Sequence, residues 1–159
     1  MKFSPIYELN CSQFIDKPIK EVFAFFSMPE NLEKITPNNL HFSIITPTPI
    51  PMKKDQIIDY VIKLRGFKIR WSSIITDYKP PNYFVDQQIR GPYSIWIHKH
   101  YFTEKDGGTL IEDCINYKIP LGILGRIAHY LFVRNDLEKI FEFRSKTILK
   151  LLVNNISKN

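Results

Sequence analysis

Residues 83–118, YFVDQQIRGPYSIWIHKHYFTEKDGGTLIEDCINYK, contain the pattern that decides the fold of this chain. Three runs rich in aromatic and β-branched residues, Tyr83–Arg90, Tyr93–Thr103 and Thr109–Lys118, are separated by Gly91-Pro92 and by Lys105-Asp-Gly-Gly108. Residues of these types favour strands, and short glycine-containing segments favour tight turns between antiparallel strands. The stretch therefore predicts three consecutive antiparallel strands.

Further strands and two short helices are expected on the N-terminal side of this stretch. Strand-like runs bounded by turn residues occupy Phe3–Ile15, His41–Thr46, Gln56–Leu64 and Lys68–Tyr78. After the first of these, Asp16 can cap a helix whose first turn contains Pro18. A second short helix is expected to begin at Pro29 and to stop at Pro37.

The C-terminal part of the chain, from about Leu121 to Ile156, is predicted to be helical. Two apolar stripes at helical spacing run along it. The first contains Leu124, Ile127, Ala128 and Leu131, and the second contains Leu137, Ile140, Phe141, Ile148, Leu151 and Leu152. At 100° per residue the stripes point in different directions, and Asn135-Asp-Leu-Glu138 between them fits a capping box. We therefore expect a break or kink near Val133–Asp136, followed by a long final helix.

This order of elements predicts an α+β fold in which a curved, seven-stranded antiparallel sheet surrounds a long C-terminal helix. A length of 159 residues fits one domain spanning 1–159, and an aromatic content of 14% can both fill a core and line a pocket. Cys11 and Cys114 lack the spacing of a disulfide framework or a zinc site, which favours two thiols in a reducing cytoplasm.

Composition and charge also narrow the classes of function. No leader segment and no apolar run near the roughly 20 residues of a membrane span is found, so a soluble cytoplasmic protein is expected. The net charge of +6 comes from scattered residues without a nucleic-acid motif, so nucleic acid is not an expected partner. No phosphate-binding, dinucleotide-binding or serine-hydrolase motif occurs, and neither a cofactor nor a metal is expected.

Three segments carry a resemblance to a known superfamily: Glu21–Leu32, Phe84–Phe102 and Leu124–His129. Together with the order of elements, they resemble a bacterial branch of the SRPBCC or START-like helix-grip superfamily. That superfamily includes START lipid-transfer domains, plant pathogenesis-related allergens and polyketide cyclases/dehydrases. The resemblance covers nearly the whole chain and implies the fold. Because the superfamily contains carriers, enzymes and regulators, it implies function only as a choice among these classes.

Alternation along the expected strands predicts which side chains face the helix. In Tyr93–Phe102, Lys99 should face water, which places Trp96, His98 and His100 on the concave face. The same argument on the other strands gives a mixed aromatic and polar set: Tyr60, Trp71, Gln88, Trp96, His98, His100, Asp113 and Tyr117. A few polar groups among apolar walls are typical of a ligand pocket, so we predict that these residues bind the ligand.

His98 and His100 are the candidates for chemistry, together with Asp113. Two residues apart on a strand, the histidines point the same way, about 7 Å apart along it. They could orient a ligand or pair with neighbours, move protons, or hold a metal with Asp113 or Asp86 as a third ligand. The first of these is favoured.

Arg144 lies on the inner stripe of the final helix, where a buried guanidinium needs a partner. We expect an internal salt bridge to Asp86 or Asp113, and the alternative is a carboxylate on a ligand. Arg144 completes the predicted ligand-binding set.

Three functions are compatible with these features. The favoured one is binding of a small hydrophobic or aromatic molecule between sheet and helix. The second is a cyclase or dehydratase that uses His98 or His100 as acid–base, with Asp113 or Tyr117 orienting the substrate. The third is a module that binds a protein or membrane through the loop Thr46–Pro51 and the basic C-terminus.

Overall fold

A single antiparallel sheet of seven strands forms the frame of the structure, a computed structural model that describes residues 5–153. The strands lie in the order β1-β7-β6-β5-β4-β3-β2. Their bounds are β1 Tyr7–Ile15, β2 Ser43–Ile44, β3 Ile57–Leu64, β4 Phe67–Lys79, β5 Tyr83–Arg90, β6 Ile95–Lys105 and β7 Gly108–Lys118. Hairpins join β3 through β7, as the turn residues predicted, and β1 pairs with β7.

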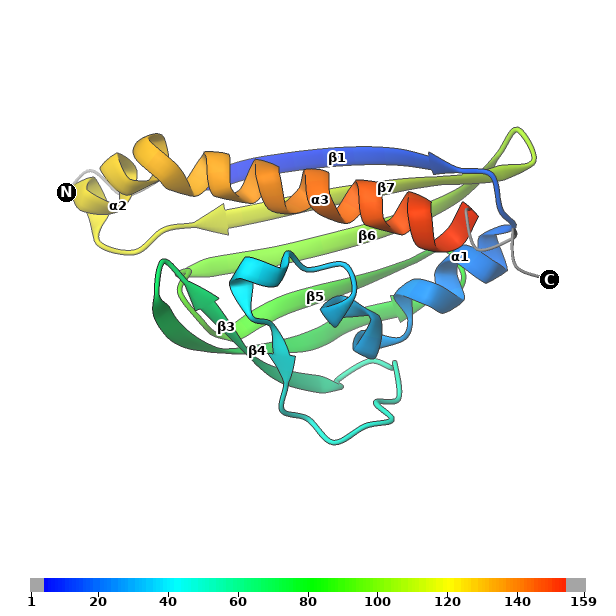
Figure 1. Cartoon of the computed structure of the whole chain (residues 1–159), viewed down its shortest axis with the longest axis horizontal. Coiled ribbons are helices and arrows are strands. Elements are labelled where there is room, and N and C mark those ends of the chain that lie inside the picture. Colours follow the sequence, from blue (N-terminus) through cyan, green and yellow to red (C-terminus); the bar gives the residue numbers. More distant parts are fainter. Residues whose placement is uncertain (1–4, 154–159) are drawn as a thin grey trace.

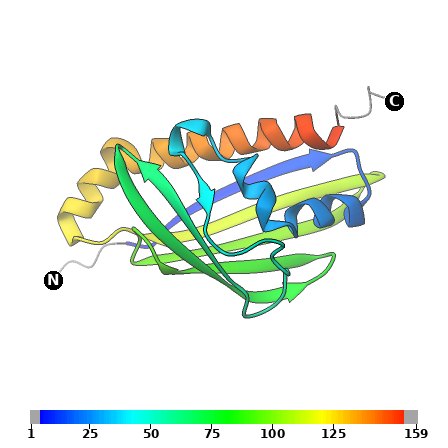
Figure 2. The same ribbon diagram turned by 60° about the horizontal axis from the view of Figure 1, so that its bottom comes forward.

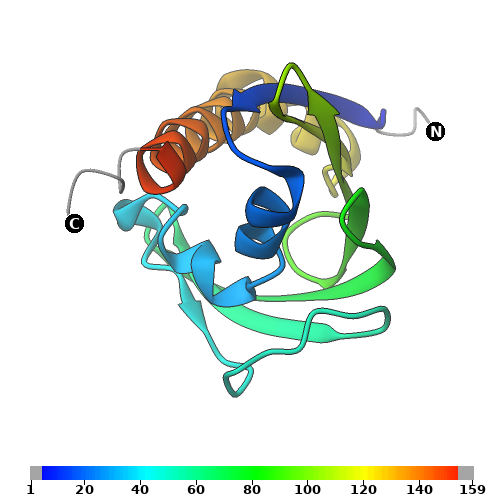
Figure 3. The same cartoon turned by 90° about the vertical axis from the view of Figure 1, so that its right-hand side faces the viewer.

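Helices cover the concave face of this sheet. The short helices α1 (Ile19–Phe26), η1 (Pro29–Glu33) and η2 (Asn38–Leu40) connect β1 to β2. After β7 come α2 (Gly122–Ala128), the π-helix η3 (His129–Val133) and the long α3 (Arg134–Val153). Figure 1 shows α3 running along the sheet, with α2 at the end from which β1 starts. Seen from one end, the sheet curls round, and α1 lies across the opening (Figure 3).

The observed architecture confirms the predicted fold class, a curved seven-stranded antiparallel sheet around a long C-terminal helix. The exposure of β6 residues alternates as the sequence predicted, with Trp96, His98, His100 and Phe102 at 2–7% exposure. Apolar residues pack at both ends of the concave face. Phe23, Phe102 and Ile148 belong to one cluster, and Trp71, Trp96, Leu137 and Phe141 belong to the other.

Two predictions about the N-terminal region were wrong in detail. Asp16 does not cap α1: the helix begins after Pro18, and no side chain caps it. The strand predicted over His41–Thr46 is reduced to Ser43–Ile44, because a 3₁₀ turn ends in His41 with positive φ and the proline-rich loop follows. The N-terminal strand begins at Tyr7, and Phe3, where it was predicted to begin, lies outside the described residues.

Of the break or kink predicted near Val133–Asp136, no break occurs, and the irregularity that the structure has there is the π-helical turn η3, which ends at Val133. The chain is helical without interruption from Gly122 to Val153, and Asn135 lies inside α3 rather than capping it. The change of direction between the two apolar stripes is instead taken up at η3, where one π-helical turn widens the helix. Within residues 5–153, no helix is both long and apolar enough to cross a membrane.

Candidate functional site

A cavity of about 170 Å³ lies between the sheet and α3. Its walls are mainly aromatic and aliphatic side chains from β3, β4, β6, α3 and the short helices after α1. An engineered apolar cavity of about 150 Å³ holds a benzene molecule. The cavity therefore has room for one ring or a short chain without movement of the walls.

Six residues of the predicted binding set line this cavity: Tyr60, Trp71, Trp96, His98, His100 and Arg144. Strand register accounts for the aromatic wall, because Tyr60 pairs directly with Trp71 across β3 and β4. Their rings are stacked with centroids 5.8 Å apart, and the Trp96 ring meets that of Trp71 edge-on at 5.3 Å. The Trp71 indole donates a hydrogen bond to Ser73 Oγ at 3.1 Å, which fixes the ring against the wall.

Three residues of the predicted set do not line the cavity. Gln88 donates to the backbone carbonyl of Tyr93 at 2.7 Å and accepts from its N–H, so its side chain closes the β5–β6 turn. The Tyr117 hydroxyl lies 2.9 Å from His129 Nε2, which holds it against the start of the helical region. Asp113 lies beneath the two histidines. The alternation of side chains along the strands gave the correct face of the sheet for Gln88, Asp113 and Tyr117. It did not show that their side chains stop short of the cavity.

Asp86, His98, His100 and Asp113 form a compact cluster on the sheet side of the cavity. Register explains it: His98 on β6 is paired with Asp86 on β5, and His100 is paired with Asp113 on β7. Each histidine therefore has one carboxylate directly beside it and the other on the diagonal. The four side chains come from three adjacent strands, so their positions are fixed by the backbone ladder.

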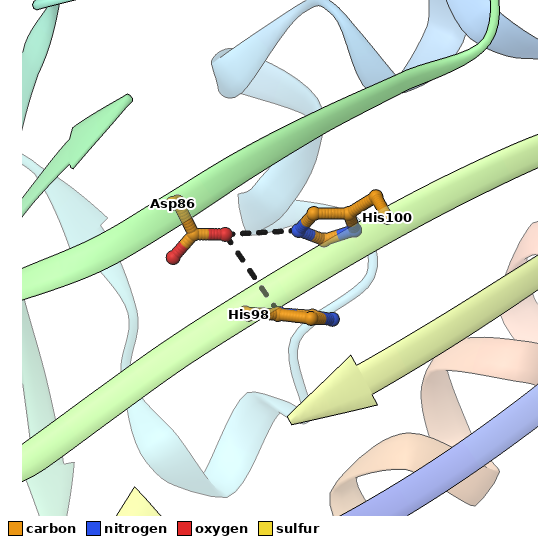
Figure 4. Close-up of side chains that lie close together, drawn as sticks. All are labelled: Asp86, His98 and His100. Atoms are coloured by element: carbon orange, nitrogen blue, oxygen red, sulfur yellow. Dashed lines mark hydrogen bonds and ion pairs between the residues drawn. The ribbon is translucent and has the colours of Figure 1, made fainter. Parts of the chain in front are cut away.

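Hydrogen bonds join the cluster in diagonal pairs. His98 Nε2 is 2.8 Å from Asp113 Oδ1, and His100 Nε2 is 2.9 Å from Asp86 Oδ2. Asp86 also lies 3.8 Å from His98 Nδ1, so it faces both rings (Figure 4). His100 Nδ1 is 2.9 Å from Asp113 Oδ1, but it forms no aligned hydrogen bond, so this contact is an ion pair only.

The two histidines differ in their electrostatic environment. Burial lowers the pKa of His98 from its usual value, and the neighbouring His100 lowers it further. Burial opposes the charged form of His100 as well, but its contacts with Asp113 and Asp86 outweigh this and raise its pKa. Burial likewise disfavours both carboxylates, yet the histidines hold the pKa values of Asp86 and Asp113 below their usual range. The cluster thus favours a neutral His98 beside a protonated His100.

Arg144 projects into the same cavity from α3. The predicted salt bridge to Asp86 or Asp113 is not formed: among the described residues, Arg144 makes no ion pair and its buried Nε has no hydrogen-bond partner. Its guanidinium carbon lies 4.9 Å from the centroid of the Phe141 ring. Burial lowers the Arg144 pKa, while Asp113, Tyr60 and Asp86 oppose this, and an arginine stays charged in any protein environment.

The buried ionisable groups around the cavity carry charges of both signs. The lowered pKa values of Asp86 and Asp113 favour their negative forms, Arg144 is positive, and the raised pKa of His100 favours its positive form. With His100 protonated, two negative charges face two positive ones around the unpaired Nε–H of Arg144.

The same cluster could also hold a metal ion. Nitrogen and oxygen atoms of Asp86, His98 and His100 all lie within 4.8 Å of one another, and two imidazoles with one carboxylate are a common donor set. The hydrogen bonds among the four side chains account for the geometry without a metal, because both Nε2 atoms are engaged by carboxylates.

Several cavity residues were missing from the predicted set. Asp86 shares a strand face with Phe84, and the alternation along β5 was a sufficient signal for it. Leu137 and Phe141 line the cavity two turns and one turn before Arg144 on α3, and their helical spacing placed all three on one stripe. Phe25 and Leu32 come from the segment after β1, and only the tertiary structure brings that segment over the cavity.

The seven-stranded curved sheet and the long helix across it define the helix-grip fold, which confirms the resemblance at the level of the fold. No protein-family model matches the sequence, and no curated protein does. Solved structures do match in three dimensions. The protein TTHA0849 from Thermus thermophilus has a TM-score of 0.75 at 16% identity, over 95% of this chain and 100% of that chain.

Two further solved structures that match are a plant protein and a protein from a biosynthetic pathway. Major latex-like protein 151 from Panax ginseng has a TM-score of 0.69 at 12% identity, over 93% of this chain and 98% of that one. The di-domain ARO/CYC StfQ from the steffimycin biosynthetic pathway has a TM-score of 0.72 at 13% identity, over 96% of this chain and 53% of that one. At these identities the likeness concerns the fold alone.

Proposed function

We propose that this protein binds a small, largely apolar molecule with one hydrogen-bond-accepting oxygen in the cavity between the sheet and α3. The observation that carries the proposal is Arg144: a buried guanidinium whose Nε–H has no partner among the described residues, at the wall of an otherwise aromatic cavity. An unmade buried hydrogen bond costs about 1–3 kcal/mol. A ligand oxygen would remove this cost.

The charge balance favours a neutral acceptor, such as a ketone or ester carbonyl, over a carboxylate. A carboxylate would add a negative charge to a site whose two carboxylates are already matched by His100 and Arg144. Its binding would then require a further proton, and His98 is the group able to accept one. Carboxylates should therefore bind more weakly than neutral acceptors at neutral pH. Their affinity should increase as the pH falls.

Three one-ring probes test the proposal by isothermal titration calorimetry. Acetophenone carries a neutral carbonyl, benzoate a carboxylate, and ethylbenzene no acceptor. We expect acetophenone to bind most tightly, and Arg144→Gln to weaken it about tenfold, the effect of one lost hydrogen bond. Lys146→Gln, which removes an exposed charge two residues further along α3, is the control. Equal affinity for all three probes, unaffected by Arg144→Gln, would contradict the proposed recognition.

A second candidate function is acid–base catalysis of the cyclase or dehydratase type. His98 favours it, because a neutral imidazole at the cavity wall, held through Nε2 by Asp113, has the arrangement of a general base. His98→Gln should then abolish turnover of a β-keto substrate while leaving acetophenone affinity within a factor of two. If His98→Gln retains full turnover of such a substrate, the catalytic role of His98 is excluded.

A further inference from the structure

An apolar patch lies on the outside of the helical region that follows β7. It consists of Leu121, Ile123, Leu124, Ile127, Tyr130 and Leu131, whose exposed fractions are 50–87%. Six large apolar side chains in eleven residues are at least half exposed, whereas exposed apolar residues elsewhere in the described chain are scattered. Concentrated exposure of this kind marks an interaction site rather than ordinary surface.

The patch is one face of a helix. Ile123, Leu124, Ile127, Tyr130 and Leu131 follow the i, i+1, i+4, i+7, i+8 spacing of an apolar stripe, across α2 and η3. Such a stripe normally faces the core. Here the opposite side is occupied by Gly125, which is buried and so close to the chain that a Cβ would lie 2.0 Å from the Pro120 carbonyl oxygen. This close contact directs the apolar stripe outward.

The tip of the β3–β4 hairpin extends the surface. Arg65 forms an ion pair with Asp136 at 2.7 Å, and its guanidinium stacks on the Phe132 ring at 4.3 Å. These contacts hold the tip beside η3, and Figure 2 shows the β3–β4 hairpin next to the helical segment there. Phe67 at this tip is 75% exposed, and the exposed Lys63 and Lys68 flank it.

The charge around this surface is mainly positive, since Asp136, the acidic residue at its edge, is paired with Arg65. From Lys118 to Asn135 the sequence contains no aspartate or glutamate, and Arg126 is exposed within the patch. The hairpin tip, residues 63–68, also lacks acidic residues. An apolar stripe with a basic border is the pattern of a helix that lies in the interface of an anionic bilayer.

We propose that α2, η3 and the β3–β4 tip form a docking surface for an anionic lipid bilayer. The apolar side chains enter the boundary between headgroups and acyl chains, while Arg126, Lys63 and Lys68 contact the phosphates. A second copy of the chain fits the surface less well. A two-fold dimer would bring the same patch, and therefore its cations, together from both subunits. This inference does not depend on what the cavity holds.

Flotation with vesicles tests the proposal. The full chain is mixed with vesicles of phosphatidylcholine alone, or of phosphatidylcholine and phosphatidylglycerol in equal amounts. We expect binding to the anionic vesicles that weakens at high salt. Leu124→Ser should reduce the affinity for anionic vesicles about tenfold, because it removes one leucine side chain that enters the bilayer. Leu149→Ser, at another exposed leucine near the far end of α3, should leave the affinity unchanged.

Charge is tested separately from apolar contact. Arg126→Glu should weaken binding to anionic vesicles and not to neutral ones, whereas Lys105→Glu, in the β6–β7 hairpin, should change neither. Sedimentation velocity on the same proteins tests the alternative occupant. A dimer that Leu124→Ser converts to a monomer would overturn the proposal, and so would absence of flotation by the wild type.

Discussion

At the scale of single residues, the Asp–His cluster shows how pairing on a sheet creates a polar site from ordinary strand positions. His98 and His100 share a face because side chains alternate along β6. Asp86 and Asp113 become their partners because β5 and β7 flank β6 in the observed register. The result is a buried cluster in which the two carboxylates are matched by the charge of His100 and by that of Arg144 on α3.

Asp113→Asn tests the cluster at this scale. We expect the pKa of His100 to fall, because the neutral amide no longer favours the imidazolium, and the free energy of unfolding to fall by about 3 kcal/mol. Histidine ring signals followed by NMR over a pH titration, with urea unfolding alongside, give both quantities. Asp106→Asn, at an exposed turn between β6 and β7, is the control. An unchanged His100 pKa in Asp113→Asn would show that Asp113 does not stabilise its charge.

At the scale of elements, the region from α2 to α3 is one continuous helical segment with two apolar stripes that face in different directions. The α3 part turns Leu137, Phe141 and Arg144 toward the cavity. The α2 part turns its apolar stripe away from the protein. The π-helical turn of η3 separates them, since one extra residue in a turn rotates everything that follows. Both stripes and their different directions were visible in the sequence, but not that the α2 stripe faces away from the protein.

Gly125→Ala tests how α2 is attached. The new methyl group would overlap the Pro120 carbonyl oxygen, so we expect the free energy of unfolding to fall by about 1–3 kcal/mol, as for other overpacked sites. Ile123→Ala, two residues earlier on the exposed stripe, should change it by less than about 0.5 kcal/mol. Thermal or urea unfolding of both variants and of the wild type measures these changes in the free energy of unfolding. Equal effects from the two substitutions would mean that Gly125 is not a packing contact.

At the scale of the whole molecule, the curved sheet and α3 enclose a site whose walls combine aromatic side chains with ionisable ones. The cavity is lined by residues of all three apolar clusters of the core, and the ionisable side chains of Asp86, His98, His100 and Asp113 are held beside it inside the folded protein. Their ionisation is therefore linked to global stability.

Stability should consequently depend on pH in a predictable direction. The pKa values of Asp86 and Asp113 are lowered by folding, so the unfolded state binds protons more readily, and stability is lost as the pH falls below about 4. His98, whose pKa is also lowered, adds to this loss below about 6.5. His100, whose pKa is raised, contributes stability that is lost as the pH rises through its folded pKa.

Urea unfolding at a series of pH values checks this behaviour. The wild type should lose stability toward acid more steeply than Asp113→Asn, which has one fewer carboxylate to protonate. His100→Gln should remove the loss on the alkaline side. Stability profiles with the same acid slope for wild type and Asp113→Asn would contradict the conclusion that folding lowers the pKa of Asp113.

Much of the fold was predictable because it depends on local signals. Turn residues at Gly91-Pro92 and Lys105–Gly108 separate the strands of the meander, and alternation along β6 identifies its buried face. The details that failed depend on competition between local and distant contacts. Asn135 has the sequence of a helix cap, yet the helix continues through it, and Leu137, two residues further on, packs in the buried cluster of Trp71 and Trp96.

The sequence by itself determined the order of strands and helices, the concave position of His98 and His100, and the inner stripe that carries Arg144. Only the tertiary structure decided which carboxylates meet the histidines, that Arg144 Nε has no partner among the described residues, and that the stripe of α2 faces outward. Local sequence sets backbone preference and side-chain period, which are properties of neighbouring residues. Register, reach and packing direction depend on segments that are distant in the chain, and these are fixed only when the sheet closes around the helix.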